Sequence, residues 1–221
     1  MRSTFRPSSY VKTMKKTSLL FLFVITLMSF ADHAVVIPKD AFVLVVDAGH
    51  GGEDLGFTSA DGIHEKQLTL AIAQHIQQAC KEKGIQVMLT RSEDKELKLD
   101  ERVSLSAAIE SGLFISIHIN ADRHDNSKSG IECMITEQHA DYIKSKQFSQ
   151  VLTTELKTLQ GIAVHDTKNS SIYILTNNSI PTVILELGYL SNPSDFQFIS
   201  NEQNQKNIAD KIVASVLKYQ P

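Results

Sequence analysis

The sequence predicts an α/β fold in which a mainly parallel, twisted sheet is covered by helices on both faces. Two observations favour this fold. Strand-like apolar runs alternate with segments whose apolar residues recur at helical spacing, and three of the apolar runs lead into a histidine or a glutamate. Ligands of such sheets bind beyond the carboxyl ends of the strands, so these polar residues mark a candidate site.

The first half of the chain predicts three strands and two helices. In order, these are a strand at 43–46, a helix at 65–83, a strand at 85–90, a helix at 99–110 and a strand at 113–118. In the helix at 65–83, Leu68, Ile72 and Ile76 form one apolar stripe, and Gly84 ends it. A glycine-rich turn, 47–52, follows the first strand and can hold an imidazole over a cavity.

The second half continues the alternation. It predicts a strand at 131–136, a helix at 140–159 that ends before Gly161, strands at 172–175 and 182–187, and a helical tail from Pro193. About 190 residues follow residue 31, which suits one domain with a sizeable core.

The first 31 residues predict a secretory signal peptide. They contain five basic residues and no acidic one, followed by the apolar stretch Leu19 to Phe30 and the small-residue exit Ser29-Phe30-Ala31. This stretch of 12 residues is shorter than the roughly 20 that a membrane span needs, so we expect no stable span in the mature form. Residues 32–42 would be a short linker, and the protein would be exported to the periplasm or cell envelope.

Charge and cysteine content exclude some functions. Without residues 1–31 the chain has 17 basic and 25 acidic residues, a net charge of −8, so nucleic acid is not an expected partner. Cys80 falls at helical spacing with Ile72 and Ile76, and Cys133 lies in a strand-like run. We expect both to be buried thiols, although an exported protein could also bridge them.

Four polar residues stand where a hydrolytic metal site would form. His50 lies in the glycine-rich turn, Glu65 begins a helix, and His118 and Glu186 close apolar strands. Each alone also fits a structural role, such as a strand cap or a favourable first-turn carboxylate. Catalytic zinc takes three protein ligands and keeps a water, and two histidines with one glutamate form an established set. The sequence therefore predicts a zinc site at His50, Glu65 and His118.

Other chemistries find no support in the sequence. The run His64-Glu65-Lys66-Gln67-Leu68 lacks the second histidine of the helical zinc motif, which leaves His64 only as a substitute ligand for Glu65. There is no Gly-x-Ser-x-Gly elbow, and neither cysteine has the setting of a nucleophile.

Six motifs together resemble the zinc-dependent N-acetylmuramoyl-L-alanine amidases of the amidase_3 family, in order and spacing from Val43 to the C terminus. The motifs are Asp47-Ala48-Gly49-His50-Gly51-Gly52, Gly62-Ile63-His64-Glu65-Lys66, Leu89-Thr90-Arg91, Glu101-Arg102, Ser116-Ile117-His118-Ile119-Asn120-Ala121 and Leu185-Glu186-Leu187-Gly188-Tyr189-Leu190-Ser191-Asn192.

This resemblance implies that residues 43–221 form a zinc amidase catalytic domain. His50, Glu65 and His118 would bind zinc, and Glu186 would be the catalytic carboxylate. The substrate would be peptidoglycan, cleaved at the amide between the lactyl group of N-acetylmuramic acid and the L-alanine of the stem peptide.

The departures from the family pattern remove no proposed ligand. Ala48 stands where the family usually has proline, His64 where it often has arginine or leucine, and Ile119 where alanine is common. Some members also carry a helical insertion that blocks the zinc. The segment between Thr136 and Ala140 leaves no room for one.

Two other function classes stay open: a different zinc peptidase, such as a carboxypeptidase, and a non-catalytic wall-binding module. The sequence does not determine the oligomeric state.

Several further residues have weaker assignments. Asn120 could contact substrate or orient a ligand, and Asp47, which precedes the glycine turn, could lie behind the metal ligands and contact one of them. Arg91 and Arg102 could hold a peptide carboxylate, but pairing with Asp94, Asp100 or Glu101 is favoured. Four histidines have no metal-like placement and are expected on the surface: His75, His124, His139 and His165.

Overall fold

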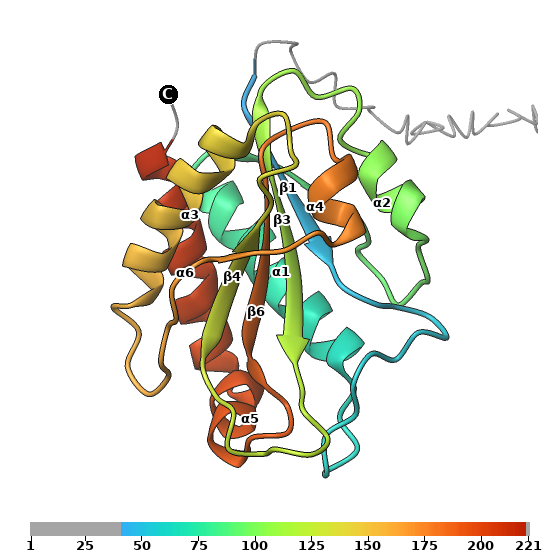
Figure 1. Ribbon diagram of the computed structural model, residues 1–221, viewed down its shortest axis with the longest axis vertical. Coiled ribbons are helices and arrows are strands. Elements are labelled where there is room, and N and C mark those ends of the chain that lie inside the picture. The colour runs from blue at the N-terminus through green and yellow to red at the C-terminus, as the bar shows by residue number, and fades with distance from the viewer. Residues whose placement is uncertain (1–40, 220–221) are drawn as a thin grey trace, which may run out of the picture. The chain divides into compact units, whose positions relative to one another are not determined.

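A six-stranded, mainly parallel sheet forms the centre of the computed structural model, which describes residues 41–219 (Figure 1). Its strands are β1 (Val43–Ala48), β2 (Gln86–Leu89), β3 (Gly112–Asn120), β4 (Ile131–Ile135), β5 (Lys168–Asn169) and β6 (Thr182–Tyr189). The spatial order is β2-β1-β3-β6-β4-β5. Strands β2, β1, β3 and β6 run parallel to one another, whereas β4 is antiparallel to β6. The predicted fold class is therefore confirmed.

Helices cover both faces of this sheet (Figure 1). One face carries α1 (Glu65–Glu82), α3 (Tyr142–Leu156) and α6 (Glu202–Tyr219), the other carries α2 (Leu99–Ser104) and α4 (Tyr173–Asn177), and α5 (Pro193–Ser200) packs on β6 and α6. Along β1, Leu44 and Val46 join the larger apolar core, while Val43 and Val45 join the smaller one. This division follows from the alternation of side chains along a strand.

The helix α1 forms where the apolar stripe predicts it. Leu68, Ile72 and Ile76 are buried in the larger core. At its amino end, the Gln67 side chain accepts a hydrogen bond of 3.0 Å from the His64 backbone N–H, which satisfies one donor of the first turn. Gly84 follows the helix with φ of 69°, a conformation that glycine adopts without strain.

Two predicted elements differ from the structure. The predicted strand at 172–175 is wrong, because most of this segment belongs to the helix α4. Ile174 and Leu175 are buried against the sheet, whereas Ile172 and Tyr173 are about 40% exposed. A short apolar run does not distinguish a strand from one turn of helix, and here packing against α2 and β6 decides.

The predicted helix at 99–110 is shorter than expected. The α-helix α2 ends at Ser104, and the backbone N–H groups of Ser106, Ala107 and Ile109 then bond to the carbonyls three residues earlier. The Ser104 and Ser106 hydroxyls also donate to nearby carbonyls. Such side-chain bonds compete with regular helix and favour tighter turns.

The predicted signal peptide at 1–31 lies outside the described residues, as does the predicted linker at 32–42 except for its last two residues. Within residues 41–219, the helices are too short or too polar to span a bilayer. Cys80 and Cys133 are both buried free thiols, as predicted. Burial raises the pKa of each to about 12, so neither is a reactive thiolate.

The turn after β1 is held by a buried network that begins at Asp47. The Asp47 carboxylate is 1% exposed and accepts hydrogen bonds of 2.7 Å from Arg102, Thr90 and Ser116. The Arg102 guanidinium also donates to the carbonyls of Ala48 and His50, at 2.7 and 2.8 Å. One buried ion pair thus fixes the backbone that carries His50.

A second buried arginine supports the same turn. The Arg91 guanidinium donates to the carbonyls of Ala48, Gly49 and Lys66 at 2.9–3.0 Å and so ties the turn to the first turn of α1. The predicted pairing of the two arginines with Asp94, Asp100 or Glu101 is therefore wrong. Within residues 41–219 their hydrogen bonds go to Asp47, to Thr69 and to main-chain carbonyls instead. Their burial also leaves them no role in holding a peptide carboxylate.

The Arg102→Ala variant tests the importance of this network. It should lower the free energy of unfolding by about 3–5 kcal/mol, because it leaves the Asp47 carboxylate buried without its cation. Urea unfolding of the variant and the wild type measures the difference. The control is Lys81→Ala, which removes an exposed cation from α1 and should change stability by less than about 0.5 kcal/mol. Equal stability of Arg102→Ala and wild type would contradict the assignment.

Candidate metal centre

His50, Glu65 and His118 come together at the carboxyl ends of β1 and β3. The Glu65 Oε1 atom lies 3.1 Å from His50 Nε2 and 3.0 Å from His118 Nδ1. One ligand atom from each residue lies within 4.8 Å of the other two. Among the described residues, this is the one group of three such side chains that could hold a metal ion.

The two histidine–glutamate distances suit a tetrahedral zinc ion. Ligand atoms about 2.05 Å from zinc at tetrahedral angles lie about 3.3 Å apart, close to the 3.0 and 3.1 Å of the two histidine–glutamate pairs. The donor set of two imidazoles and one carboxylate is also one that catalytic zinc uses, with the fourth position left to water. The residues present therefore fit a zinc ion.

The ligand atoms are aimed by local contacts. Asp54 Oδ2 lies 2.8 Å from His50 Nδ1 and so leaves the opposite ring nitrogen, Nε2, to face Glu65. A carboxylate on the outer nitrogen of a metal-binding histidine fixes the orientation of its ring. His50 itself has φ of 60°, an uncommon conformation for a residue other than glycine, and its carbonyl is held by Arg102.

Two glycines allow the groups to approach. A Cβ atom on Gly49 would lie 2.4 Å from the His118 ring, and one on Gly56 would lie 2.6 Å from Glu65 Oε2. Any larger residue at either position would push a ligand away. The glycines around His50 are therefore needed for space at these points, in addition to the freedom that they give the turn.

Glu65 is held as a charged carboxylate. Its side chain is 6% exposed, and it accepts backbone N–H bonds of 3.0 Å from Phe57 and Ile119. Burial alone would raise the pKa of Glu65, but the hydrogen bonds from His118 and His50 outweigh burial and hold the pKa well below its usual range. A permanently ionised carboxylate is what a metal ligand requires.

Glu186 lies beside His118 on the neighbouring strand. The two residues are register partners in the parallel pair of β3 and β6, so their side chains share one face of the sheet. Within residues 41–219 the Glu186 carboxylate makes no hydrogen bond or ion pair. Burial raises its pKa to about 7, against the opposing charge of His118, and the negative charges of Glu65 and Glu132 add to the increase.

The sequence interpretation missed Asp54 and Glu132. Glu132 is buried opposite Glu186 in β4, and its Oε1 accepts from Lys168 at 2.7 Å and Tyr189 at 3.1 Å. A carboxylate in the apolar run Ile131 to Ile135 is the same signal that singled out Glu186. Asp54, four residues after His50, could have been found as a carboxylate partner of that histidine.

The weaker candidates have other roles. The His64 Nδ1 atom lies 2.9 Å from the Thr58 hydroxyl, and His64 is not part of the metal-binding group. Asn120 lies at the end of β3, where its side chain accepts from the Ala121 N–H. Asp47 supports the His50 turn through Arg102.

One of the four remaining histidines differs from its prediction. His124 and His165 are exposed and His75 is partly exposed, whereas His139 is buried. The two ring nitrogens of His139 bond to the Asn178 carbonyl and the Asp141 N–H, at 3.0 and 2.9 Å. Its prediction as a surface residue is wrong because these partners are supplied by the tertiary fold and by the turn before α3.

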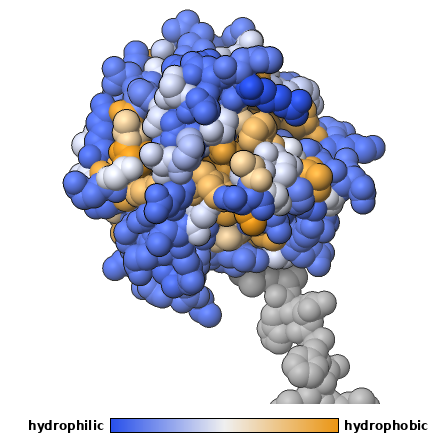
Figure 2. All heavy atoms as spheres, turned by 90° about the horizontal axis from the view of Figure 1, so that it is seen from below, coloured by the Kyte–Doolittle hydropathy of each residue, from blue (hydrophilic) through white to orange (hydrophobic). Residues whose placement is uncertain are grey.

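The centre opens at one end of the molecule. This end, where the carboxyl ends of the parallel strands lie, is seen in Figure 2, and hydrophobic residues gather in the middle of the face with hydrophilic residues around them. Gly56, which abuts the Glu65 carboxylate, also lines a cavity of about 670 Å³ at this end. The metal-binding group thus lies beside a space large enough for part of a substrate.

Known proteins share both the sequence pattern and the fold. The chain is 34% identical over 184 residues to protein YqiI of Bacillus subtilis, an alignment that covers 82% of this chain and 86% of that protein. It is 30% identical to the probable cell wall amidase LytH of Staphylococcus epidermidis, of which it spans only 60%. The crystal structure of N-acetylmuramoyl-L-alanine amidase from Clostridium difficile 630 superposes with a TM-score of 0.76 at 31% identity and covers 81% of this chain and 96% of that one.

The family model gives the same result over nearly all of the described residues. It matches residues 44–218 and is described as N-acetylmuramoyl-L-alanine amidase. The match contains the three residues of the candidate centre and Glu186. The chain therefore belongs to the amidase_3 family of N-acetylmuramoyl-L-alanine amidases.

Proposed function

We propose that this protein is a zinc-dependent peptidoglycan hydrolase that cleaves the amide between the lactyl group of N-acetylmuramic acid and the L-alanine of the stem peptide. The observation that carries the proposal is the convergence of His50 Nε2, Glu65 Oε1 and His118 Nδ1 beside Glu186, whose carboxylate is unpaired among the described residues. Membership of the amidase_3 family supports the choice of bond.

His50, Glu65 and His118 would hold the zinc ion. When bound, zinc lowers the pKa of a coordinated water to about 7 and polarises a carbonyl oxygen. The Asp54 contact on His50 and the two backbone N–H bonds to Glu65 keep these ligands in place before a metal arrives. Pre-organised ligands of this kind favour binding because little side-chain freedom is lost.

Glu186 would act as the general base and then as the general acid. Its carboxylate takes a proton from the attacking water as the new carbon–oxygen bond forms. It then gives that proton to the nitrogen of L-alanine as the carbon–nitrogen bond breaks, which releases a lactyl carboxylate and a stem peptide with a free amine. A carboxyl group whose pKa burial raises to about 7 is suited to both steps near neutral pH, and a cation bound beside it would lower that pKa.

Export of the protein to the cell envelope is part of the proposal. The basic head and apolar run of residues 1–31 support a signal peptide. The substrate lies outside the cytoplasm, and the relative LytH is named a probable cell wall amidase.

The first prediction from the proposed function separates the metal ligands from the base. The Glu186→Gln variant should bind one zinc per chain and lose roughly 10² to 10⁴ of its turnover, because the proton acceptor is gone while the ligands remain. His50→Ala and His118→Ala should lose both zinc and activity. Metal analysis after dialysis, combined with peptidoglycan hydrolysis, measures the two properties. Glu53→Gln removes an exposed carboxylate from the glycine-rich turn region and should leave both unchanged. Loss of zinc from Glu186→Gln would instead make Glu186 a ligand.

The second prediction identifies the bond that is cleaved. Mass spectrometry of peptidoglycan treated with the mature protein should show intact stem peptides released from glycan. A chelator should abolish the release, and added zinc should restore it. A carboxypeptidase would instead free only terminal amino acids, and a wall-binding module would bind the glycan without products. This activity should not require an added activator. Only six residues, 136–141, separate β4 from α3, which leaves no room there for the helical insertion that blocks the zinc in some family members.

The third prediction tests the space around His118. The Gly49→Ala variant should fold but bind zinc about 10- to 100-fold more weakly, because its Cβ would lie 2.4 Å from the His118 ring. Gly62→Ala is the matched control. Gly62 has φ of 80° and open space around it, so this variant should lose some stability and keep its zinc affinity. Equal zinc affinity of Gly49→Ala and wild type would show that His118 is not a ligand.

A further inference from the structure

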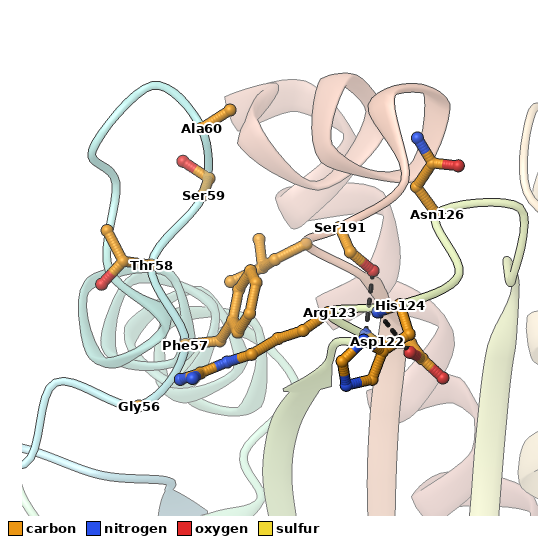
Figure 3. Close-up of a pocket in the computed structure, with 11 residues that line it drawn as sticks. Gly56, Phe57, Thr58, Ser59, Ala60, Asp122, Arg123, His124, Asn126 and Ser191 are labelled. Carbon is orange, nitrogen blue, oxygen red and sulfur yellow. Dashed lines mark hydrogen bonds between the residues drawn. The ribbon is translucent and has the colours of Figure 1, made fainter.

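The cavity beside the metal centre lies between the loop that follows β1 and the segments that follow β3 and β6. Gly56, Phe57, Thr58, Ser59 and Ala60 line one side, and the other side is formed by the residues after β3 and β6, including Asp122, Arg123, His124 and Leu190 (Figure 3). Arg123 reaches from the loop after β3 toward Gly56 and Phe57.

Arg123 gives this cavity a positive charge without a partner. Within residues 41–219 its exposed guanidinium makes no hydrogen bond or ion pair. Among the residues that the structure describes, Asp122 is the one carboxylate that lines the cavity. The Asp122 carboxylate pairs with Lys128 at 2.6 Å and accepts hydrogen bonds from the backbone N–H groups of His124 and Asp125. These contacts, the Lys128 bond most of all, lower the pKa of Asp122 to about 2. Its charge is therefore already balanced, and that of Arg123 is not.

The cavity is close enough to the centre to hold a neighbouring part of the substrate. Gly56 abuts the Glu65 carboxylate, and the Phe57 N–H donates to it, so the cavity and the metal-binding group share a wall. An extended peptide advances about 3.3–3.6 Å per residue. With L-alanine at the scissile bond, the next residue of the stem peptide would reach this cavity.

We propose that Arg123 binds a carboxylate of the stem peptide, at the residue that follows L-alanine, and so makes the enzyme prefer substrates in which that carboxylate is free rather than amidated. This inference rests on the proposed function. The planar guanidinium binds carboxylates through two parallel hydrogen bonds, a geometry that a carboxamide cannot match. The neutral sugar on the other side of the scissile bond offers no such partner.

The test compares two soluble muropeptides that differ only in a free carboxylate or a carboxamide at the residue after L-alanine. Wild type should have about a tenfold higher kcat/KM for the free carboxylate, the lower end of what a hydrogen bond to a charged group contributes. Arg123→Ala should lose this preference and keep the wild-type rate on the carboxamide. The control is Lys81→Ala, which removes one exposed cation from the last turn of α1. Lys81 does not line the cavity, so this variant should keep the preference.

Three results would overturn the proposal: no preference in wild type, an unchanged preference in Arg123→Ala, or an equal loss on both substrates, which would indicate a sugar subsite. Binding of the two muropeptides to Glu186→Gln, measured by calorimetry with and without Arg123→Ala, gives the same comparison without turnover. Failure of the proposed function is distinct, since wild type would then cleave neither muropeptide.

Discussion

The structure depends on bringing three candidate ligand atoms from distant parts of the chain to within 4.8 Å of one another. Glu65 begins a helix, His118 lies in a strand, and His50 sits in a turn with an uncommon backbone conformation. The turn lacks the regular backbone hydrogen bonds of a helix or strand, and it is held by the buried pair of Asp47 and Arg102. A buried ion pair contributes little net stability compared with apolar residues, but it fixes position strongly because either partner alone is costly.

Close packing of the backbone completes this constraint. Gly49 and Gly56 lie against the His118 ring and the Glu65 carboxylate, where a single methyl group would not fit. Arg91 ties the same turn to α1 through main-chain carbonyls. The geometry of the candidate ligands is therefore determined by backbone contacts around the centre as much as by the ligands themselves.

Two carboxylates near the centre have opposite pKa shifts, and their proposed roles follow from this difference. Glu65 receives hydrogen bonds from two histidines and two backbone N–H groups, so its pKa falls and it stays ionised. Glu186 is half-buried, has no hydrogen-bonding partner in the described residues and lies near other acids, so its pKa rises to about 7. One environment suits a metal ligand and the other suits proton transfer. Arg123, which has no partner within residues 41–219, adds a positive charge to the adjoining cavity.

Local sequence determined the strands and helices of the core, and the polar residues at the ends of apolar runs identified the group that the fold assembles. These predictions succeeded because the spacing of apolar residues identifies helices and strands, and their alternation along the chain favours a parallel sheet. The carboxyl ends of parallel strands meet at one edge of that sheet. Only the tertiary structure decided that Ile172 to Leu175 is mostly helical, that Arg91 and Arg102 face the His50 turn, that His139 is buried, and that Asp54 and Glu132 join the site. The physical reason is that a hydrogen-bonding partner many residues away leaves no periodic signal in the chain, since its position exists only after the sheet and its covering helices have packed.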